Sequence, residues 1–353
     1  MTGAAVDRLA VFDAPSPNGV APSSGAPAFK TGASFILDDP VDLDPVWGSG
    51  EDVLWAAGEP LLLVGPTGVG KTTLTVQLVA GRLGIIDEVL GWPVKPADKP
   101  VLYLALDRPN QIRRAMRRVF DERHREVLHE RLRVREGHLD FDLGRVPEHL
   151  LELASASGAG TVVLDSLKDA AVKLSDDEAG GHVNRALQLC VRDGIDVLAL
   201  HHQRKGQSGA KPKSLEDVYG STWITAGAGS VILLWGKPGD LIVELKHLKQ
   251  PAAEVGPLKV EHDHAAGKST VSGGCVDALA VLRSRPNGIT SVDLARWMFE
   301  CDTPDDNQRK KALRQLNRLV EEGKALKADD ARNAAGGAVA ARYVAITDRR
   351  AAP

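Results

Sequence analysis

The sequence has few cysteines, few aromatic residues and no long apolar run. Its 353 residues include only three cysteines, Cys190, Cys275 and Cys301. They are too few and too scattered for a disulfide framework or a zinc knuckle, so we expect a reducing, cytoplasmic setting. No apolar run approaches the roughly 18 residues of a membrane-spanning helix, and the N-terminus lacks a basic stretch followed by an apolar core. We therefore expect no membrane association and no secretion signal.

The charge balance excludes a strongly basic chain. The 44 basic and 47 acidic side chains give a formal net charge of −3, so any contact with nucleic acid has to come from local basic patches. Apolar residues make up 43% and charged residues 26% of the chain, an ordinary globular mixture that excludes a wholly disordered or fibrous protein. The length suits one large domain and a small one.

The apolar pattern predicts an α/β domain over residues 35–272, after a disordered N-terminal arm at 1–34 that is rich in Ala, Gly, Ser and Pro. Short apolar runs alternate with helical patterns, which indicates a mostly parallel sheet with helices on both faces. The runs are 61–64, 101–106, 161–164, 196–200, 230–235 and 241–246. The last two flank a Lys-Pro-Gly-Asp turn, so we expect an antiparallel hairpin at the sheet edge.

The C-terminal residues 273–353 change to a helical pattern. Residues 276–283 predict a short apolar helix, Thr290 is placed to cap a second helix, and Thr303 with the proline after it is placed to begin a third. The last apolar run, 341–347, is suited to one strand of a hairpin. Three short helices followed by a two-stranded wing predict a small winged helix-turn-helix domain.

A phosphate-binding motif is the strongest signal in the chain. The segment GPTGVGKT follows an apolar strand, precedes a helix and fits the pattern Gly-x4-Gly-Lys-Thr. Its glycines let consecutive N–H groups point at phosphate oxygens, and the helix N-terminus adds favourable dipole charge. Lys71 is placed to reach the β and γ phosphates, and the Thr72 hydroxyl to hold Mg²⁺. The expected ATP-binding residues are Gly65, Pro66, Thr67, Gly68, Val69, Gly70, Lys71, Thr72 and Thr73.

A second acid for the metal is expected at the end of a neighbouring strand. The run TVVLD ends at Asp165, which we assign to the magnesium side of the site together with Thr72. A carboxylate after a strand is also a common helix cap, so this alternative stays open.

The order of further segments is characteristic. It reads WGSGEDVLWAAGEPLLLVGPTGVGKTT, VLYLALDRPNQIRRAMRR, VVLDSL, LALHHQRKG, DVYGSTWITAGAGSVILLW and LKHLKQP. Over roughly residues 45–262 this order resembles the RecA-like ATPases, in particular the replicative helicases of DnaB and RepA type, and most closely the DnaB-like proteins of actinobacterial phages. The HHQRK and YGST segments are the more discriminating markers. The resemblance implies a RecA-like fold, ATP hydrolysis, and assembly into a ring, expected to be a hexamer.

The resemblance also implies roles for two residues that follow strands. The acid after the second strand polarises the attacking water, and Asp107 stands where the family usually has Glu. Asp107 is also placed to cap the helix that opens at Pro109. His202 falls at the position of a γ-phosphate sensor, which is Gln in DnaB-type and His in RepA-type proteins. The alternatives for His202 and its neighbour His201 are a structural pair or a zinc site.

Two lysines at the end of the predicted hairpin complete the expected catalytic set. By resemblance, a Lys/Arg pair from this strand enters the neighbouring subunit's nucleotide site and neutralises charge in the transition state. Here Lys246 and Lys249 are spaced Lys-x-x-Lys instead of the family's Lys-x-Arg, so either residue is a candidate. Their alternative role is that of edge-strand lysines that discourage aggregation.

Three basic elements are candidates for contact with DNA. Directly after His202 comes QRKGQSGAKPK, which by resemblance faces the ring channel and grips single-stranded DNA, and which is otherwise a solvated loop. The third C-terminal helix carries a basic stripe suited to the major groove or to solvent. The candidate residues are Arg204, Lys205, Lys211 and Lys213 in the loop, and Lys311 (or Lys310), Arg314 and Arg318 in the helix. The arginine-rich segment 108–135 is expected mainly to face solvent or another subunit.

These observations favour an ATP-hydrolysing DnaB/RepA-type helicase or helicase-like motor that acts on DNA in replication. The alternative is an ATP-switched replication initiator or helicase loader without unwinding activity. A third interpretation is a kinase-like phosphotransferase, since a P-loop alone supports that chemistry.

Overall fold

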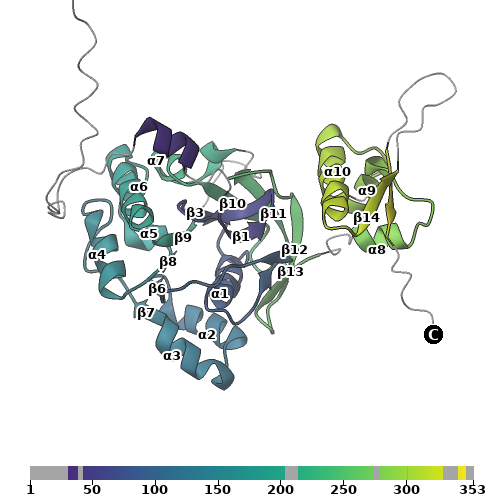
Figure 1. Ribbon diagram of the computed structural model, residues 1–353. Helices are drawn as coiled ribbons and strands as arrows, with labels where there is room; N and C mark the ends of the chain where they lie inside the picture. The colour runs from purple at the N-terminus through teal and green to yellow at the C-terminus, as the bar shows by residue number, and fades with distance from the viewer. Residues whose placement is uncertain are drawn as a thin grey trace, which may run out of the picture. The chain divides into compact units, whose positions relative to one another are not determined.

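The computed structural model describes most of the chain (Figure 1), namely residues 31–38, 43–202, 214–272, 278–299, 301–328 and 341–346. Most of the predicted N-terminal arm, and the basic segment 203–213, lie outside the described residues. Ser34–Asp38, which begin at the last residue of the predicted arm, form one short π-helical segment that belongs to a separate unit from the rest of the predicted α/β domain.

A nine-stranded sheet forms the centre of the large domain, in the order β13-β12-β11-β10-β3-β9-β8-β6-β7. Six strands are parallel: β3 (Leu61–Val64), β6 (Val101–Ala105), β7 (Leu132–Glu136), β8 (Thr161–Asp165), β9 (Asp196–His201) and β10 (Ser230–Trp235). Three strands run antiparallel to their neighbours: β11 (Ile242–Lys249), β12 (Leu258–Asp263) and β13 (Lys268–Val271). All six apolar runs predicted from the sequence are strands of this sheet.

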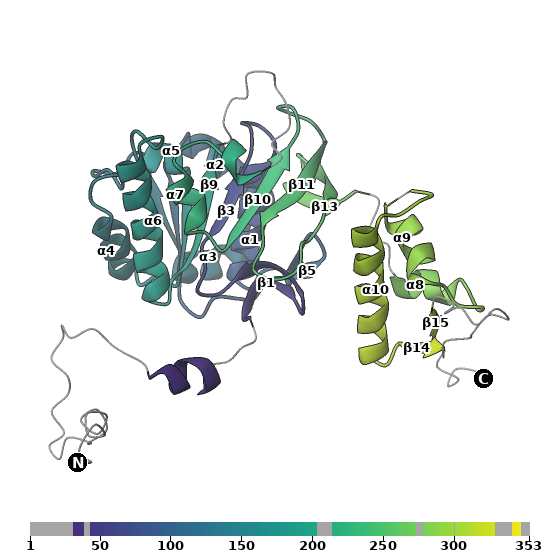
Figure 2. The ribbon, with the colours of Figure 1, turned by 90° about the horizontal axis from the view of Figure 1, so that it is seen from above.

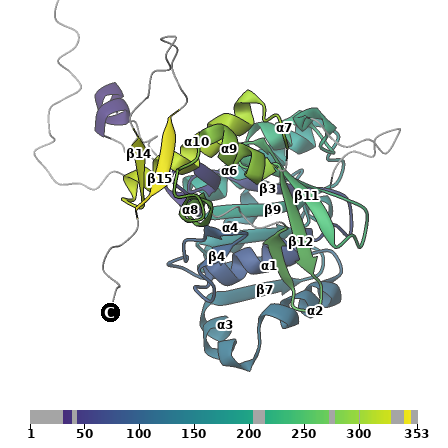
Figure 3. The same cartoon turned by 90° about the vertical axis from the view of Figure 1, so that its right-hand side faces the viewer.

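The predicted hairpin of β10 and β11 is present, but it does not form the sheet edge. β12 pairs with β11 and β13 pairs with β12, so the sheet continues past the hairpin (Figure 3). The prediction of an edge was wrong because the segment LKVEHD alternates apolar and polar residues and has no continuous apolar run. β13 packs against α1 (Lys71–Arg82), which brings this late hairpin close to the P-loop helix.

Helices cover both faces of the sheet (Figure 2). One face packs against α1, α2 (Pro109–Val119) and α3 (Arg125–Arg131), and the other against α4 (Glu148–Ala156), α5 (Leu167–Ala170), α6 (Asp177–Arg192) and α7 (Thr222–Ala226). Two small hairpins, β1 (Pro45–Ser49) with β2 (Asp52–Ala56) and β4 (Glu88–Val89) with β5 (Trp92–Pro93), lie on the α1 face. The first hairpin buries Trp47 and Trp55 completely.

The strand order explains where the functional segments meet. β9 lies between β3, which leads into the P-loop, and β8, which ends at Asp165. Because these strands are parallel to one another and to β6, their carboxyl ends share one edge of the sheet. The P-loop, Asp107, Asp165 and His202 all follow those ends. The domain therefore has the RecA-like α/β fold that the resemblance implies.

The C-terminal residues form three helices and a strand pair with their own core. The elements are α8 (Ala278–Arg283), α9 (Ser291–Phe299), α10 (Asp306–Glu321), β14 (Ala325–Ala328) and β15 (Arg342–Ala345). Thr290 and Asp293 exchange the expected capping bonds at α9. α10 begins later than predicted because Asp305, which accepts from Gln308 N at 2.8 Å, is the N-cap in place of Thr303. The winged-helix assignment stays a prediction.

Over the described part of the chain, no helix combines the length and the apolar character needed to cross a membrane.

We predict that Arg82→Ala lowers the free energy of unfolding by about 3 kcal/mol, because it leaves the largely buried carboxylate of Asp196 without its main counter-ion. Arg82 is 4% exposed, and it donates to Asp196 Oδ2 at 2.6 Å and to Thr161 Oγ1 at 3.0 Å. These bonds tie α1 to the first residues of β8 and β9. Urea unfolding measures the effect, with Arg192→Ala at the exposed end of α6 as a control expected within about 0.5 kcal/mol. A loss below about 1 kcal/mol would contradict the prediction.

Candidate functional site

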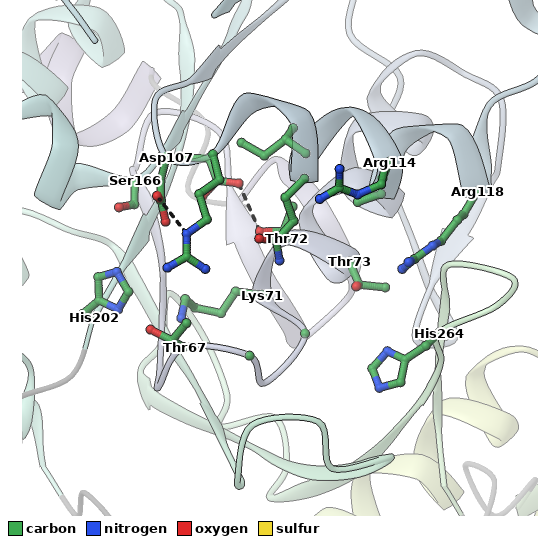
Figure 4. Close-up of a pocket in the computed structure, with 17 residues that line it drawn as sticks. Thr67, Lys71, Thr72, Thr73, Asp107, Arg114, Arg118, Ser166, His202 and His264 are labelled. Atoms are coloured by element: carbon green, nitrogen blue, oxygen red, sulfur yellow. Dashed lines mark hydrogen bonds and ion pairs between the residues drawn. The ribbon is translucent and has the colours of Figure 1, made fainter. Parts of the chain in front are cut away.

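A pocket of about 230 Å³ lies at the carboxyl edge of the parallel strands (Figure 4). The P-loop, the first turn of α1 and one side of α2 from Gln111 to Arg118 form most of its wall. The lining is completed by Asp107, Arg108, Asp165, Ser166, His202 and His264. Four of the segments that the sequence analysis assigned to ATP hydrolysis thus meet in one cavity.

The P-loop needs glycine at two positions because atoms of the neighbouring strands lie too close for a side chain. A Cβ on Gly65 would lie 2.2 Å from Leu234 O of β10, and a Cβ on Gly70 would lie 2.3 Å from the His262 Nε2 atom of β12. Gly70 also has a φ of +86°, which disfavours other residues. Gly70 is the N-cap of α1 and provides no side-chain cap. The N–H groups of the first helical turn are therefore left to an anion.

Lys71 is buried inside this loop. Its Nζ donates to Gly65 O at 2.8 Å and to Pro66 O at 2.7 Å. Burial lowers the pKa of Lys71 to about 8, although Asp165 and Asp107 oppose the shift. The two loop carbonyls thus hold the ammonium group beside the expected phosphate position. A phosphate oxygen can replace either carbonyl as the acceptor of its hydrogen bond.

Asp165 is the centre of a buried hydrogen-bond network. Its Oδ2 accepts from Thr72 Oγ1 at 3.1 Å and from the Tyr103 hydroxyl at 2.8 Å. Burial raises the pKa of Asp165 to about 6, and the bonds from Tyr103 and Thr72 limit the rise. The N-cap of α5 is Ser166, so the capping alternative for Asp165 is wrong. A hydroxyl and a carboxylate at this distance are hard oxygen donors of the kind that Mg²⁺ prefers, so the residues present fit the metal.

Asp107 lies directly beside this network. Both Leu106 N and Asp107 N donate to Asp165 O, at 2.9 and 3.0 Å. The alternative role of Asp107 as a cap for α2 is wrong, because the N-cap position belongs to Arg108 and has no side-chain cap bond. Arg108 adopts a left-handed conformation with a φ of +49°, and the helix begins at Pro109 as expected. The Asp107 carboxylate lies 3.6 Å from Arg108 Nε and lines the pocket.

The two histidines after β9 have different surroundings. His201 is fully buried, with Nε2 2.6 Å from Tyr219 O, and burial lowers its pKa to about 4. His202 lines the pocket, and burial together with the nearby Lys71 lowers its pKa, which favours a neutral imidazole. Among the described residues no group of His, Cys, Asp and Glu is arranged to hold a metal ion, so nothing supports the zinc alternative.

The pocket also contains residues that the sequence analysis did not assign to it. Figure 4 shows Arg114, Arg118 and His264 beyond Thr73 at one end, opposite the end that holds Asp107. The arginines of α2 were expected mainly to face solvent or another subunit. Arg114 and Arg118 instead lie on the side of α2 that lines the cavity.

The predicted lysines of β11 and the predicted basic residues of α10 do not line this pocket. β12 pairs with β11 only up to Leu245, so Lys246 and Lys249 lie beyond that pairing and the edge-strand alternative stays open for them. Lys249 Nζ donates to Ala226 O at 2.8 Å, at the end of α7. On α10, Arg318 pairs with Glu322 at 2.9 Å. Arg204, Lys205, Lys211 and Lys213 lie outside the described residues, while Lys311 and Arg314 lie on α10.

We predict that Asp165→Asn raises the free energy of unfolding at pH 8 by on the order of 2–3 kcal/mol while it weakens binding of Mg²⁺-nucleotide. The folded-state pKa of about 6 exceeds the ordinary value of 3.8, so this group costs stability as the pH rises through 6. The advantage of the Asn variant should therefore shrink as the pH falls from 6 to 4. Urea unfolding at several pH values measures it, and the exposed Asp193→Asn serves as control. If the difference in unfolding free energy between Asp165→Asn and the parent does not change with pH, Asp165 does not have the raised pKa on which this prediction rests.

Comparison with known proteins gives one family match and many similar solved structures, two of which are described below. A family model described as an AAA domain matches residues 34–208, which include the P-loop, Asp107, Asp165 and His202. A search of curated protein sequences finds no significant match.

The first structure, described as "ATPase Domain of G40P", is 14% identical, with a TM-score of 0.43 over 61% of this chain and 85% of that one. The second, a KaiC-like protein from the hyperthermophilic archaeon Pyrococcus horikoshii OT3, is 18% identical, with a TM-score of 0.45 over 66% of this chain and 99% of that one. The family match and the geometry of the P-loop together support a RecA-like P-loop ATPase.

Proposed function

We propose that this protein is an ATP-driven motor on DNA, a DnaB/RepA-type helicase or helicase-like enzyme that acts in replication. The observation that carries the proposal is the position of His202, which lines the nucleotide pocket and immediately precedes the basic segment 203–213. His202 thereby links the terminal phosphate to the next residues of the chain, whose positive charge suits a nucleic-acid backbone.

Binding of ATP uses the P-loop and the residues around it. Backbone N–H groups of the loop and of the first turn of α1 bind the phosphates, and Lys71 transfers its hydrogen bonds from the loop carbonyls to phosphate oxygens. Thr72 and Asp165 would hold Mg²⁺, which neutralises charge on the β and γ phosphates when it is bound.

Hydrolysis needs a group that orients water and accepts its proton. Asp107 is the acid in the pocket with a side chain that is not enclosed in the Asp165 network. It is one methylene shorter than glutamate, so it acts on the water directly or through a second water. The neutral His202 imidazole donates a hydrogen bond to the γ phosphate. Hydrolysis breaks this bond, and the release of His202 changes the conformation of the following segment 203–213.

Assembly into a ring supplies the remaining positive charge. In this proposal Lys246 or Lys249 reaches the site of the neighbouring subunit and stabilises the negative charge of the transition state there. A hexamer is the ring that the resemblance suggests. DNA passes through its channel and is held mainly by backbone phosphates, since the sequence of segment 203–213 contains no aromatic residue.

An ATP-switched initiator or loader is the second candidate. The C-terminal helices and strand pair favour it, because α10 carries Lys311, Arg314 and Arg318 at a spacing that places them along one side of the helix. In that case the small domain binds duplex DNA and ATP controls only assembly. Displacement of a DNA strand separates a motor from a loader.

We predict that single-stranded DNA stimulates ATP hydrolysis by the full chain and that Lys71→Ala abolishes turnover with and without DNA. The variant lacks the main cation for the γ phosphate but keeps the α1 core. Phosphate release measures turnover, and circular dichroism checks the fold. Lys99→Ala, on the surface before β6, is the matched lysine control. Full turnover in a folded Lys71→Ala variant would refute the nucleotide site, and stimulation by a small-molecule acceptor but not by DNA would favour a phosphotransferase.

We predict that two inactive variants complement each other in mixed rings. A Lys246→Ala/Lys249→Ala subunit keeps its own P-loop, while a Lys71→Ala subunit still offers its lysines to the next site. Mixing the two should restore part of the ATPase activity, increasingly with protein concentration because recovery requires subunit exchange. Normal activity of the lysine-deficient protein alone would show that neither lysine acts in a neighbouring site. No recovery in mixed rings that demonstrably form would exclude shared sites and favour the loader.

A further inference from the structure

A buried histidine from the late hairpin touches the back of the P-loop. His262 of β12 is 1% exposed, with Nε2 3.1 Å from Val69 O and Nδ1 2.8 Å from Ser269 Oγ of β13. We propose that His262 is a positioning residue that holds the Val69–Gly70 peptide in the orientation required for phosphate binding. The inference rests on the proposed nucleotide function of the pocket, and it names a residue that the P-loop motif does not contain.

The hydrogen bonds around His262 define which ring nitrogen carries the proton. Gln77 of α1 donates from Nε2 to Ser269 Oγ at 3.0 Å, and its Oε1 accepts from Ser269 N at 3.0 Å. The Ser269 hydroxyl hydrogen is then directed to His262 Nδ1, so that the proton of the neutral ring is on Nε2. That N–H donates to Val69 O. The pKa of His262 is lowered by burial, which is consistent with a neutral ring.

This bond matters because of the geometry of a peptide. In a trans peptide the C=O and the following N–H point in opposite directions. When His262 fixes Val69 O on the side of β12, the Gly70 N–H is fixed on the opposite side, which faces the pocket. Gly239 N donates to Gly68 O at 3.0 Å and orients the preceding peptide in the same manner. Two successive N–H groups are thereby aligned before a phosphate arrives, as in an anion-binding nest.

His247 provides a matched control within the same sheet. It is 2% exposed in β11, with Nε2 2.8 Å from Ser230 Oγ, and that serine donates to Leu54 O at 2.6 Å. Like His262 it is a buried histidine bonded to a serine, but its partners belong to the core on β2 and β10. Replacing either histidine disturbs packing, and only His262 bonds to the P-loop.

The experiment measures binding of ADP to the full chain by titration calorimetry, together with thermal stability without nucleotide. His262→Ala should weaken ADP binding by about 10- to 50-fold, because part of the binding free energy is then used to order the P-loop. His247→Ala should lower thermal stability to a similar extent while it changes ADP affinity by less than about twofold. His262→Gln, whose side-chain amide can donate to Val69 O, should recover affinity to within about fivefold of the parent.

Ser269→Ala tests the proposal without touching the ring that contacts the loop. The substitution removes the hydroxyl that donates to His262 Nδ1, so ¹⁵N spectra of the imidazole should show a mixture of both tautomers. ADP binding should weaken about threefold. This variant decides the question if His262→Ala does not fold. ADP binding unchanged in His262→Ala, or in Ser269→Ala where His262→Ala does not fold, overturns the inference while the proposed function stands. A parent chain that binds no nucleotide overturns both.

Discussion

The shape of the P-loop depends on contacts made by strands that come late in the sequence. Leu234 O of β10 closes on Gly65, Gly239 N–H bonds to Gly68 O, and His262 bonds to Val69 O. A loop that directs its N–H groups into a pocket must turn its carbonyls outward, where they need partners of their own. β12 and the turn after β10 supply partners for two of them, while Leu234 O of β10 only packs against Gly65. The phosphate site is therefore a property of the whole sheet and not only of an eight-residue motif.

The same edge of the sheet concentrates charge that weakens the fold. Asp165 is held inside the protein by Tyr103 and Thr72 although burial raises its pKa to about 6. Lys71, its nearest cation in the network, bonds to loop carbonyls at 2.8 and 2.7 Å and does not pair with Asp165 directly. A buried acid and a buried lysine that are each only partly compensated favour a ligand that brings both phosphate and metal.

Sequence reasoning located the parts of the site that have local signals. The P-loop has a fixed spacing, and β3, β6, β8 and β9 are continuous apolar runs, so the motif and the strand ends were enough to assign Lys71, Thr72 and Asp165. Parallel strands then bring their carboxyl ends together regardless of the distance along the chain. The alternative role of Asp107 as the cap of α2 was wrong, because Arg108 is the N-cap and its left-handed conformation leaves no mark in the sequence.

The parts that could not be predicted depend on long-range pairing. His262 meets Val69 across 193 positions of the chain, and Gln77 meets Ser269 across 192. β12 alternates polar and apolar residues and β13 has a single apolar residue, so both lack the pattern of the buried strands. Tyr103 is buried like its apolar neighbours in β6, and its hydroxyl finds its partner, Asp165, on another strand. No local pattern specifies such contacts.

Crystal structures of the full chain without nucleotide and with Mg²⁺-ADP test the central claim most directly. If the late strands shape the P-loop in advance, the backbone of residues 65–70 should superpose within about 1 Å between the two structures. The bonds from His262 to Val69 O and from Gly239 to Gly68 O should be present in both, and Lys71 Nζ should move from the loop carbonyls to phosphate oxygens. A P-loop that occupies the pocket or loses these two bonds when nucleotide is absent would contradict the account.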